Sequence, residues 1–151
     1  MSSPLRVFHQ LQIAHAALFR AADQRTQSEL GLSNTQLGVL FVLQRKDGLP
    51  ISDIAKALAV GKPGLTGLID RMCERALVRR APSKEDRRVT HVFLEPRGRQ
   101  MLEGGSAEVK RFNAALLAPF SAEEQAVIGR FLTHITENAS DIICGDPAKE
   151  D

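Results

Sequence analysis

The stretch ISDIAKALAVGKPGLTGLIDRM, residues 51–72, reads as two helices joined by a short turn. Apolar side chains recur at helical spacing on both sides of Gly61, and this glycine is expected to end the first helix. Ser52 or Asp53 is expected to cap the first helix, and Pro63 suits the first turn of the second. Two helices across a turn of about three residues, the second longer and more basic, are typical of a helix-turn-helix motif.

Two strand-like runs follow this motif directly. LVRRA (77–81) and RVTHVFL (88–94) alternate with a period of two, so that Val92 and Leu94 share one face of the second run. The charged segment PSKEDRR (82–88) between them is too long for a two-residue turn. The pattern therefore predicts a hairpin with an extended, charged tip, and a hairpin directly after a helix-turn-helix is a wing.

Helical patterns precede the motif. One long helix is expected over residues 5–30, where apolar side chains fall on helical spacing and Gly31 provides the end. A second helix is expected over residues 33–48, because Ser33 and Gln36 have the spacing of a capping box and a broad apolar face follows.

Helical patterns also follow the wing. The chain returns to helix at Pro96 and is stopped by Pro119, and a second capping box at Ser121 opens a final helix. Residues 145–151 read as an unstructured tail. The chain has 151 residues, is 43% hydrophobic and only 5% aromatic, and has no Trp or Tyr, so its core must consist mostly of Leu, Ile, Val and Ala. The expected fold class is mainly α, with a small β-hairpin wing.

The charge distribution points to a polyanion as partner. The formal net charge is only +2, but residues 61–100 contain ten Lys or Arg against five acids. A local cluster of cations, not the chain average, gives affinity for phosphate backbones. Lys62, Thr66 and Arg71 lie on the outward face of the second helix of the motif, where they are placed to contact phosphates or base edges.

The tip of the wing has a spacing of its own. Asp86 and Arg88 are two residues apart, so on an extended stretch they point to the same side and the carboxylate is expected to hold the arginine in a fixed direction. A fixed arginine suits insertion into a DNA minor groove, because less rotamer entropy is lost on binding. Lys84 and Arg87 are the expected phosphate contacts beside it.

Other classes of function have little support in the sequence. The four histidines are scattered, no hydrolase, metalloprotease or phosphate-loop motif occurs, and no cofactor or metal site is indicated, so the chain is not expected to be an enzyme. Cys73 and Cys144 are too few and too far apart for a disulfide framework, and Cys73 is read as a core residue and not as a redox sensor. No signal peptide or membrane span is expected, which favours a cytoplasmic protein.

Nearly the whole chain resembles the MarR (multiple antibiotic resistance regulator) family of bacterial transcription factors. The most specific parts of the resemblance are LIDRM at residues 68–72, EDRR at residues 85–88, and the L-x-x-x-G pattern from Leu94 to Gly98. The resemblance implies a homodimer whose residues 1–32 and 96–144 form intertwined dimerisation helices, with residues 33–95 as a winged helix-turn-helix DNA-binding lobe.

The resemblance also implies a function and its residues. It implies a regulator, expected to be a repressor, that binds a pseudo-palindromic site on double-stranded DNA and is released by a small-molecule effector. It places the second helix of the motif in the major groove, Arg88 in the minor groove and Asp86 in support of Arg88. The candidate DNA contacts are Ser52, Lys62, Pro63, Gly64, Thr66, Gly67, Arg71, Lys84, Arg87 and Arg88.

An effector pocket is implied between the dimerisation helices and the lobe. The candidate ligand contacts on the helices concerned are His15, Phe19, Phe41, Arg111 and Phe112. Because arginine and histidine bind anions and phenylalanines form apolar walls, the expected effector is a phenolic or aromatic carboxylate. Ordinary packing or surface positions remain the alternative for each of the five.

Three positions depart from the family pattern. Gly67 stands where an arginine is common, Ala76 where a glycine is common, and Glu95 where a threonine is usual. Gly67 removes one expected DNA contact and motivates an alternative function, an interaction protein that kept the dimer and lost sequence-specific DNA binding. Ala76 requires either a negative φ or modest strain, whereas Glu95 followed by Pro96 still suits the start of a helix.

Overall fold

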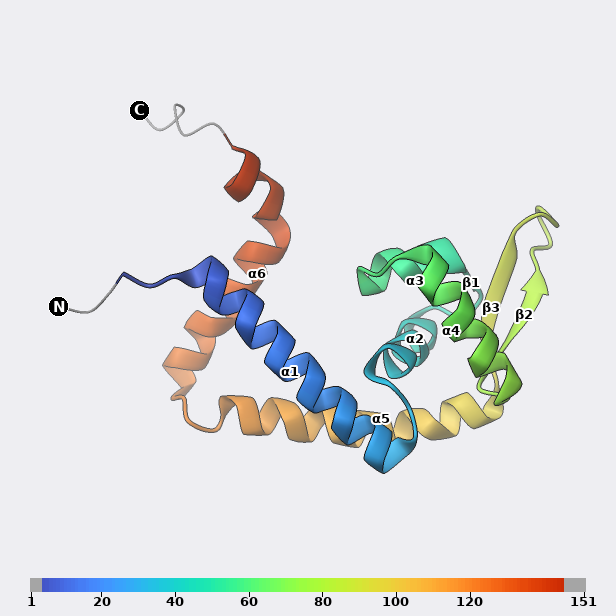
Figure 1. Ribbon diagram of the computed structural model, residues 1–151, viewed down its shortest axis with the longest axis horizontal. Coiled ribbons are helices and arrows are strands. Elements are labelled where there is room, and N and C mark those ends of the chain that lie inside the picture. The colour runs from blue at the N-terminus through green and yellow to red at the C-terminus, as the bar shows by residue number, and fades with distance from the viewer. Residues whose placement is uncertain (1–3, 146–151) are drawn as a thin grey trace. The chain divides into compact units, whose positions relative to one another are not determined.

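The computed structural model describes residues 4–145 and confirms a mainly α chain with a β-hairpin wing (Figure 1). Its elements in chain order are α1 (Val7–Leu30), α2 (Asn34–Arg45), β1 (Leu49–Pro50), α3 (Ile51–Leu58), α4 (Lys62–Glu74), β2 (Val78–Pro82), β3 (Thr90–Leu94), α5 (Pro96–Leu117) and α6 (Ala122–Cys144). Across the described residues, none of these helices combines the length and the apolar character needed to cross a membrane. The tail expected at residues 145–151 lies, apart from Gly145, outside the described residues.

The chain divides into two units, with the boundary between Val109 and Lys110, inside the long helix α5. The first unit contains α1 to β3 and the first part of α5, and the second contains the rest of α5 and α6. Within the first unit the hairpin β2–β3 extends as a narrow ribbon alongside α4 (Figure 1). The assignment of residues 1–32 and 96–144 to dimerisation stays a prediction.

Local sequence signals fix the ends of several helices as predicted. Gly31 ends α1 in the left-handed conformation, with a φ of 63°. At the start of α2 the Ser33 hydroxyl accepts a hydrogen bond from the Gln36 N–H (3.1 Å), and the Gln36 side chain accepts one from the Ser33 N–H (2.9 Å). Ser121 and Glu124 form the same capping box at the start of α6. These bonds satisfy N–H groups that a helix start leaves without partners.

The turn between α3 and α4 has the predicted length, but two predictions about its helices were wrong. Pro50, not Ser52 or Asp53, precedes the first turn of α3, and no side chain caps it. Ser52 and Asp53 lie inside the first helical turn of α3, where the helix dipole still stabilises the Asp53 carboxylate. Ala59, not Gly61, ends α3 in the left-handed conformation with a φ of 53°, and Gly61 is the N-cap of α4.

The wing belongs to a three-stranded antiparallel sheet of order β1-β3-β2. Val78 pairs with Leu94 and Arg80 with Val92, and the burial of Val92 and Leu94 confirms the predicted alternation along β3. The edge strand β1 was not predicted, because two residues carry no period and Pro50 is depleted in strands. It pairs with β3 and so fixes the start of α3 to the root of the wing.

One hydrophobic core holds the motif, the sheet and the start of α5 together. Leu40, Ile54, Ile69 and Val92 are fully buried in it, one from each of α2, α3, α4 and β3, and α5 adds Leu102. Because these residues bury one stripe of each helix and one face of the sheet, α4 and the hairpin are held in a defined relation to each other.

Ala76 is the residue whose conformation the sequence left open, and the structure places it in the strained alternative. Its φ is 55°, in the turn that joins α4 to β2. A Cβ in the left-handed region costs about 1 kcal/mol or more, whereas glycine adopts that region freely. Ala76 is exposed, so its side chain contributes little packing in return.

Replacing Ala76 with glycine is therefore expected to raise the free energy of unfolding by about 1 kcal/mol. Urea denaturation followed by circular dichroism measures the change. Ala57→Gly, at an exposed position inside α3, is the control and is expected to lower stability by about 1 kcal/mol. Equal destabilisation by both substitutions contradicts strain at Ala76.

Candidate nucleic-acid interface

The first turn of α4 presents an exposed face on which Gly64 carries no side chain. Lys62, Pro63 and Gly64 are exposed, while Leu65 and Ile69 on the opposite side are buried in the core. A Cβ added to Gly64 meets no described atom within 4 Å. The backbone of this helix end can therefore approach a groove wall closely, with its N–H groups and dipole directed at a phosphate.

Thr66 and Arg71 lie on this same helix, on the face predicted for them. The Thr66 hydroxyl donates to the Lys62 carbonyl oxygen (3.1 Å), so it retains lone pairs to accept a hydrogen bond from a base or an N–H group. A Cβ on Gly67 would lie 3.8 Å from Nη1 of Arg71, which places the Arg71 guanidinium over the missing side chain. Within residues 4–145 neither Arg71 nor Lys62 has an ion-pair partner.

The tip of the wing is closed by main-chain and side-chain hydrogen bonds. The Ser83 N–H donates to the Val89 carbonyl (2.8 Å), and the Val89 N–H donates to the Asp86 carbonyl (3.0 Å). The buried hydroxyl of Ser83 accepts from the N–H groups of Glu85 (3.2 Å) and Asp86 (3.4 Å). A charged, exposed loop is thus held in one backbone conformation.

Asp86 supports Arg88 in a different way from the one predicted. Its Oδ1 accepts a hydrogen bond from the main-chain N–H of Arg88 (3.0 Å), and not from the guanidinium. When an Asp carboxylate accepts a hydrogen bond from the main-chain N–H two residues later, the chain forms an Asx turn. This turn competes with an ion pair between the side chains. Asp86 therefore fixes the backbone at Arg88 and leaves the guanidinium free to bind a ligand.

The remaining candidates are exposed on the same elements. Lys84, Arg87 and Arg88 lie at the wing tip and Ser52 on α3, and among the residues that the structure describes no acid pairs with any of these three cations. The structure thus brings most of the predicted residues to two places in one unit, the helix α4 and the tip of the wing, and places Ser52 on α3.

Sequence reasoning missed the contact that joins α4 to the wing. Nη1 of Arg80, on β2, forms an ion pair with Oδ1 of Asp70, and its Nη2 donates to the Thr66 carbonyl oxygen (3.3 Å). The period of two along β2 was a usable signal, because it places Arg80 on the same face as buried Val78, toward α4.

Cys73 is half-buried on α4, as expected of a core residue. Burial raises the pKa of its thiol, and the nearby Arg80 opposes the rise only in part. A raised folded-state pKa means that the thiol form stabilises the fold below the ordinary thiol pKa, and that this contribution is lost as the pH rises toward the folded-state value.

Alkylation of Cys73 is accordingly expected to be slow at neutral pH, with a half-maximal rate at a pH above that of an unfolded thiol. Iodoacetamide labelling of the Cys144→Ser variant across a pH series, followed by mass spectrometry, measures this. The same variant in urea supplies the unfolded reference. Rapid labelling of folded Cys73 at neutral pH contradicts the prediction and reopens a redox role.

A cavity lies beside two of the five candidate ligand residues. Phe19 from α1 and Phe41 from α2 line a volume of about 240 Å³ together with Leu58 and Val109. A neighbouring hollow of about 460 Å³ shares Phe41, Leu58 and Val109 with it. The walls are mostly apolar, as in sites that bind small aromatic molecules.

The other three candidate ligand residues do not line this cavity. The centroid of the His15 ring lies 5.7 Å from the centroid of the Phe19 ring, which lines the cavity. Arg111 and Phe112 belong to the second unit, where the Arg111 guanidinium lies over the Phe112 ring at 5.6 Å. Their part in a ligand site stays a prediction.

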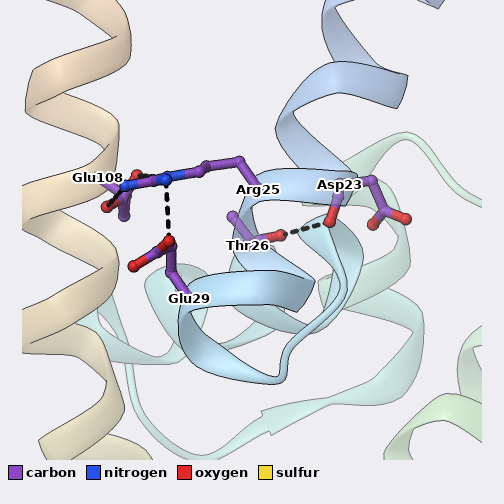
Figure 2. A network of polar contacts seen from close by, with 5 residues as sticks. All are labelled: Asp23, Arg25, Thr26, Glu29 and Glu108. Atoms are coloured by element: carbon purple, nitrogen blue, oxygen red, sulfur yellow. Dashed lines mark hydrogen bonds and ion pairs between the residues drawn. The ribbon is translucent and has the colours of Figure 1, made fainter.

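An ion-pair network that the sequence did not reveal joins α1 to α5 (Figure 2). Nε and Nη2 of Arg25 donate to the two carboxylate oxygens of Glu108 (3.1 and 3.3 Å), and Nη1 pairs with Glu29 (2.8 Å). The hydrogen bond to Glu108 is the main cause that raises the pKa of the Arg25 guanidinium. Glu108 directly precedes Val109, so this network fixes the helix that forms one wall of the cavity.

The chain matches known proteins over most of its length. Residues 30–89 match the model of the MarR family. An HTH-type transcriptional regulator of Bacillus subtilis, YfiV, is 34% identical over 117 residues, which cover 74% of this chain and 71% of the relative. This chain belongs to the MarR family. It is thus a DNA-binding transcriptional regulator by family, and its relatives are regulators and not enzymes.

Solved MarR-type regulators share the fold. Bordetella bronchiseptica BpsR, described with a mechanism by which 6-hydroxynicotinic acid regulates its DNA binding, is 25% identical with a TM-score of 0.77 and covers 87% of this chain and 99% of its own. Streptococcus pneumoniae FabT in complex with DNA is 21% identical with a TM-score of 0.75, and covers 91% of this chain and 97% of its own.

Proposed function

We propose that this MarR-family protein is a homodimeric repressor that binds a pseudo-palindromic operator and is released by a small aromatic acid. The observation that carries the DNA-binding part is the pair of exposed cationic surfaces in the first unit, the outward face of α4 with Lys62 and Arg71 and the tip of the wing. Helix, turn, helix and wing follow one another in the order that forms a DNA-docking surface. Since its target is the genome, the expected compartment is the cytoplasm.

The proposed contacts follow from this geometry. The open face of α4, with Thr66 and Arg71, is assigned to the major groove, and Lys62 and the helix N-terminus to a phosphate. Arg88 is assigned to the minor groove, since its guanidinium is exposed while its backbone is held by Asp86. Ser52, Lys84 and Arg87 are assigned to the phosphate backbone.

Comparison of two duplexes tests this function directly. Wild-type protein is titrated with a duplex carrying the region upstream of its own gene and with a random duplex, at several ionic strengths. Preference for the first, with affinity that falls steeply with salt, is the expected result. No preference at any ionic strength contradicts the proposal and favours the alternative, an interaction protein of the same fold, for which Gly67 is the motivating feature.

The dimer is proposed from the second unit and the start of α1. No residue of α6 is buried, although the helix has a row of large apolar side chains. Among them Phe131, Leu132 and Ile142 are 39%, 51% and 50% exposed. Phe8 on α1 is 67% exposed. Apolar surface of this extent on a soluble regulator requires cover, and a second copy of the same chain provides it symmetrically.

The molar mass in solution tests the dimer. Light scattering after size exclusion is expected to give twice the 16.5 kDa of the chain. The chain mass itself, at micromolar concentration, contradicts the intertwined dimer and with it the palindromic operator.

The effector is proposed to occupy the cavity lined by Phe19 and Phe41. Its volume of about 240 Å³ suits a single aromatic ring with small substituents. Binding is expected to stabilise the folded protein by mass action, and an aromatic carboxylate at about a hundred times its Kd adds about 2.7 kcal/mol.

Thermal denaturation in the presence of hydroxylated and unsubstituted aromatic carboxylates measures this. Phe41→Ala removes one wall and is expected to abolish the rise in Tm. A stabilising acid that acts equally on the Phe41→Ala variant contradicts this site, and a series without any stabilising acid contradicts the effector class. Repression is tested by a reporter under the same promoter, whose expression is expected to rise when the gene is deleted.

A further inference from the structure

We propose that Arg80 is a positioning residue that fixes α4 to the wing, so that both docking elements meet an operator as one rigid body. This inference rests on the proposed DNA-binding function. It assigns no DNA contact to Arg80, although this residue is one of the ten cations of the basic segment at residues 61–100.

The guanidinium of Arg80 spans about one turn of α4. Nη1 pairs with Asp70, and Nη2 donates to the carbonyl oxygen of Thr66, four residues earlier (3.3 Å). The Arg80 side chain is 32% exposed. This is the lowest exposed fraction among the four arginines that form the ion pairs described for residues 4–145. A planar guanidinium held at two points of one helix fixes the orientation of that helix against β2.

The register of the hairpin explains why Arg80, and not its neighbour, reaches α4. Arg80 stands opposite buried Val92, so its aliphatic stem leaves the strand on the core face. Arg79 leaves on the other face, where its guanidinium lies 4.5 Å from the Phe93 ring centroid and its Nε pairs with Glu95 (3.1 Å). The two adjacent arginines thus have separate partners. Arg79 contacts Phe93 on β3 and Glu95 directly after β3, whereas Arg80 contacts α4.

The ion pair also neutralises the negative charge of Asp70 on the outward face of α4. The Asp70 side chain is 53% exposed on the outward side of α4, where an unpaired carboxylate repels DNA phosphates. Arg80 neutralises it, and the Arg80 side chain is less exposed than that of Asp70. The second bond holds the backbone of Thr66, the residue assigned to the major groove.

The positioning role has a measurable signature. An exposed ion pair contributes little to stability, so loss of Arg80 leaves the fold and the shared core intact. It removes the two-point contact that fixes the exact orientation of α4 and the wing. Operator binding then has to order them, which costs affinity. A phosphate ligand behaves otherwise, because its loss weakens binding to all sequences and lowers the salt dependence by about one counterion per site.

The experiment compares Arg80→Gln with Arg79→Gln, a matched neighbour in an ion pair of its own. Both are titrated with operator and random duplex at several salt concentrations, with Tm measured beside them. Arg80→Gln is expected to weaken operator binding about tenfold with an unchanged salt slope and little change for random duplex, while Arg79→Gln stays near wild type. Arg80→Lys, which keeps the charge but not the two-point contact, is expected to lie between wild type and Arg80→Gln.

A double-mutant cycle with Asp70→Asn separates positioning from charge. If Arg80 acts through Asp70, the double variant binds operator no worse than Arg80→Gln alone. Additive losses, a lowered salt slope, or wild-type operator affinity in both Arg80→Gln and Arg80→Lys overturn the inference while wild-type operator binding stands. If the wild type shows no operator preference, the proposed function fails and this inference fails with it. If Arg80→Gln unfolds, the Arg80→Lys and Asp70→Asn variants decide the same question.

Discussion

Alanine at Gly98 is expected to lower the free energy of unfolding by about 3 kcal/mol, a large share of the stability of a small domain. Gly98 is the third residue of α5 and is buried where this helix crosses the turn before β2. A Cβ there would lie 2.2 Å from the Leu77 carbonyl oxygen and 3.3 Å from a methyl carbon of Leu40. The first contact is with backbone, so no side-chain rotation relieves it. α5 has to move away from the core, or the turn at Ala76 has to change.

Gly64 offers a matched control for this substitution. It is the third residue of α4, as Gly98 is of α5, but a Cβ there meets no described atom within 4 Å. Gly64→Ala is expected to raise stability by about 0.5 to 1 kcal/mol, because alanine favours the helix more than glycine does. Urea denaturation of both variants measures the difference. A similar stability for both contradicts the close approach of α5 to the Leu77 carbonyl.

The sequence predicted the features of this fold that depend on neighbours along the chain. The capping boxes at Ser33 and Ser121, the left-handed Gly31 and the alternation along β3 are all observed. Each depends on residues within one turn or one strand, so spacing alone is enough to identify it. The glycine of the L-x-x-x-G pattern, Gly98, was also identified by its spacing. The reason that a glycine is needed there, the close approach of the Leu77 carbonyl, comes from another part of the chain.

Features that depend on competition between two local structures were predicted incorrectly. By its spacing the Asp86 carboxylate could accept from the Arg88 guanidinium or from the Arg88 N–H, and the structure shows the N–H as its partner. The cap of α3 and the glycine that ends it were wrong for a similar reason, since Pro50 and Ala59 take these places. The spacing of the residues allows both alternatives, so it does not show which of the two local structures forms.

Contacts between elements were not predicted from the sequence, even where the period of two along β2 indicated the face of Arg80. Arg25 and Glu108 are 83 residues apart, and Arg80 and Asp70 come from a strand and a helix whose relative placement is unknown before folding. One sequence position therefore has several chemically equivalent partners. Phe19 and Phe41 were placed near a pocket only through the family resemblance, and the cavity between them is the observation that keeps them as candidates.

Alanine at Arg88 is expected to weaken operator binding about a hundredfold at physiological salt while the dimer remains intact. A groove-inserted arginine contributes roughly 1 to 2 kcal/mol, and a homodimer on a palindromic site uses two of them. The expected loss is therefore about a hundredfold in affinity. The Arg88 side chain has no ion-pair partner within residues 4–145, so its removal leaves no unpaired charge behind and the fold is expected to be unchanged.

Three measurements on the Arg88→Ala variant separate the wing from other causes. Fluorescence anisotropy gives the operator affinity and its salt slope, light scattering gives the dimer, and thermal denaturation gives the fold. Arg130→Ala, which removes an exposed arginine from α6, is the control for net charge and is expected to bind like wild type. Asp86→Ala is expected to lose a smaller part of the affinity, because it frees the backbone at Arg88 but keeps the guanidinium. Unchanged operator affinity in Arg88→Ala removes the wing from the mechanism, since its exposed guanidinium and fixed backbone would then have no consequence for binding.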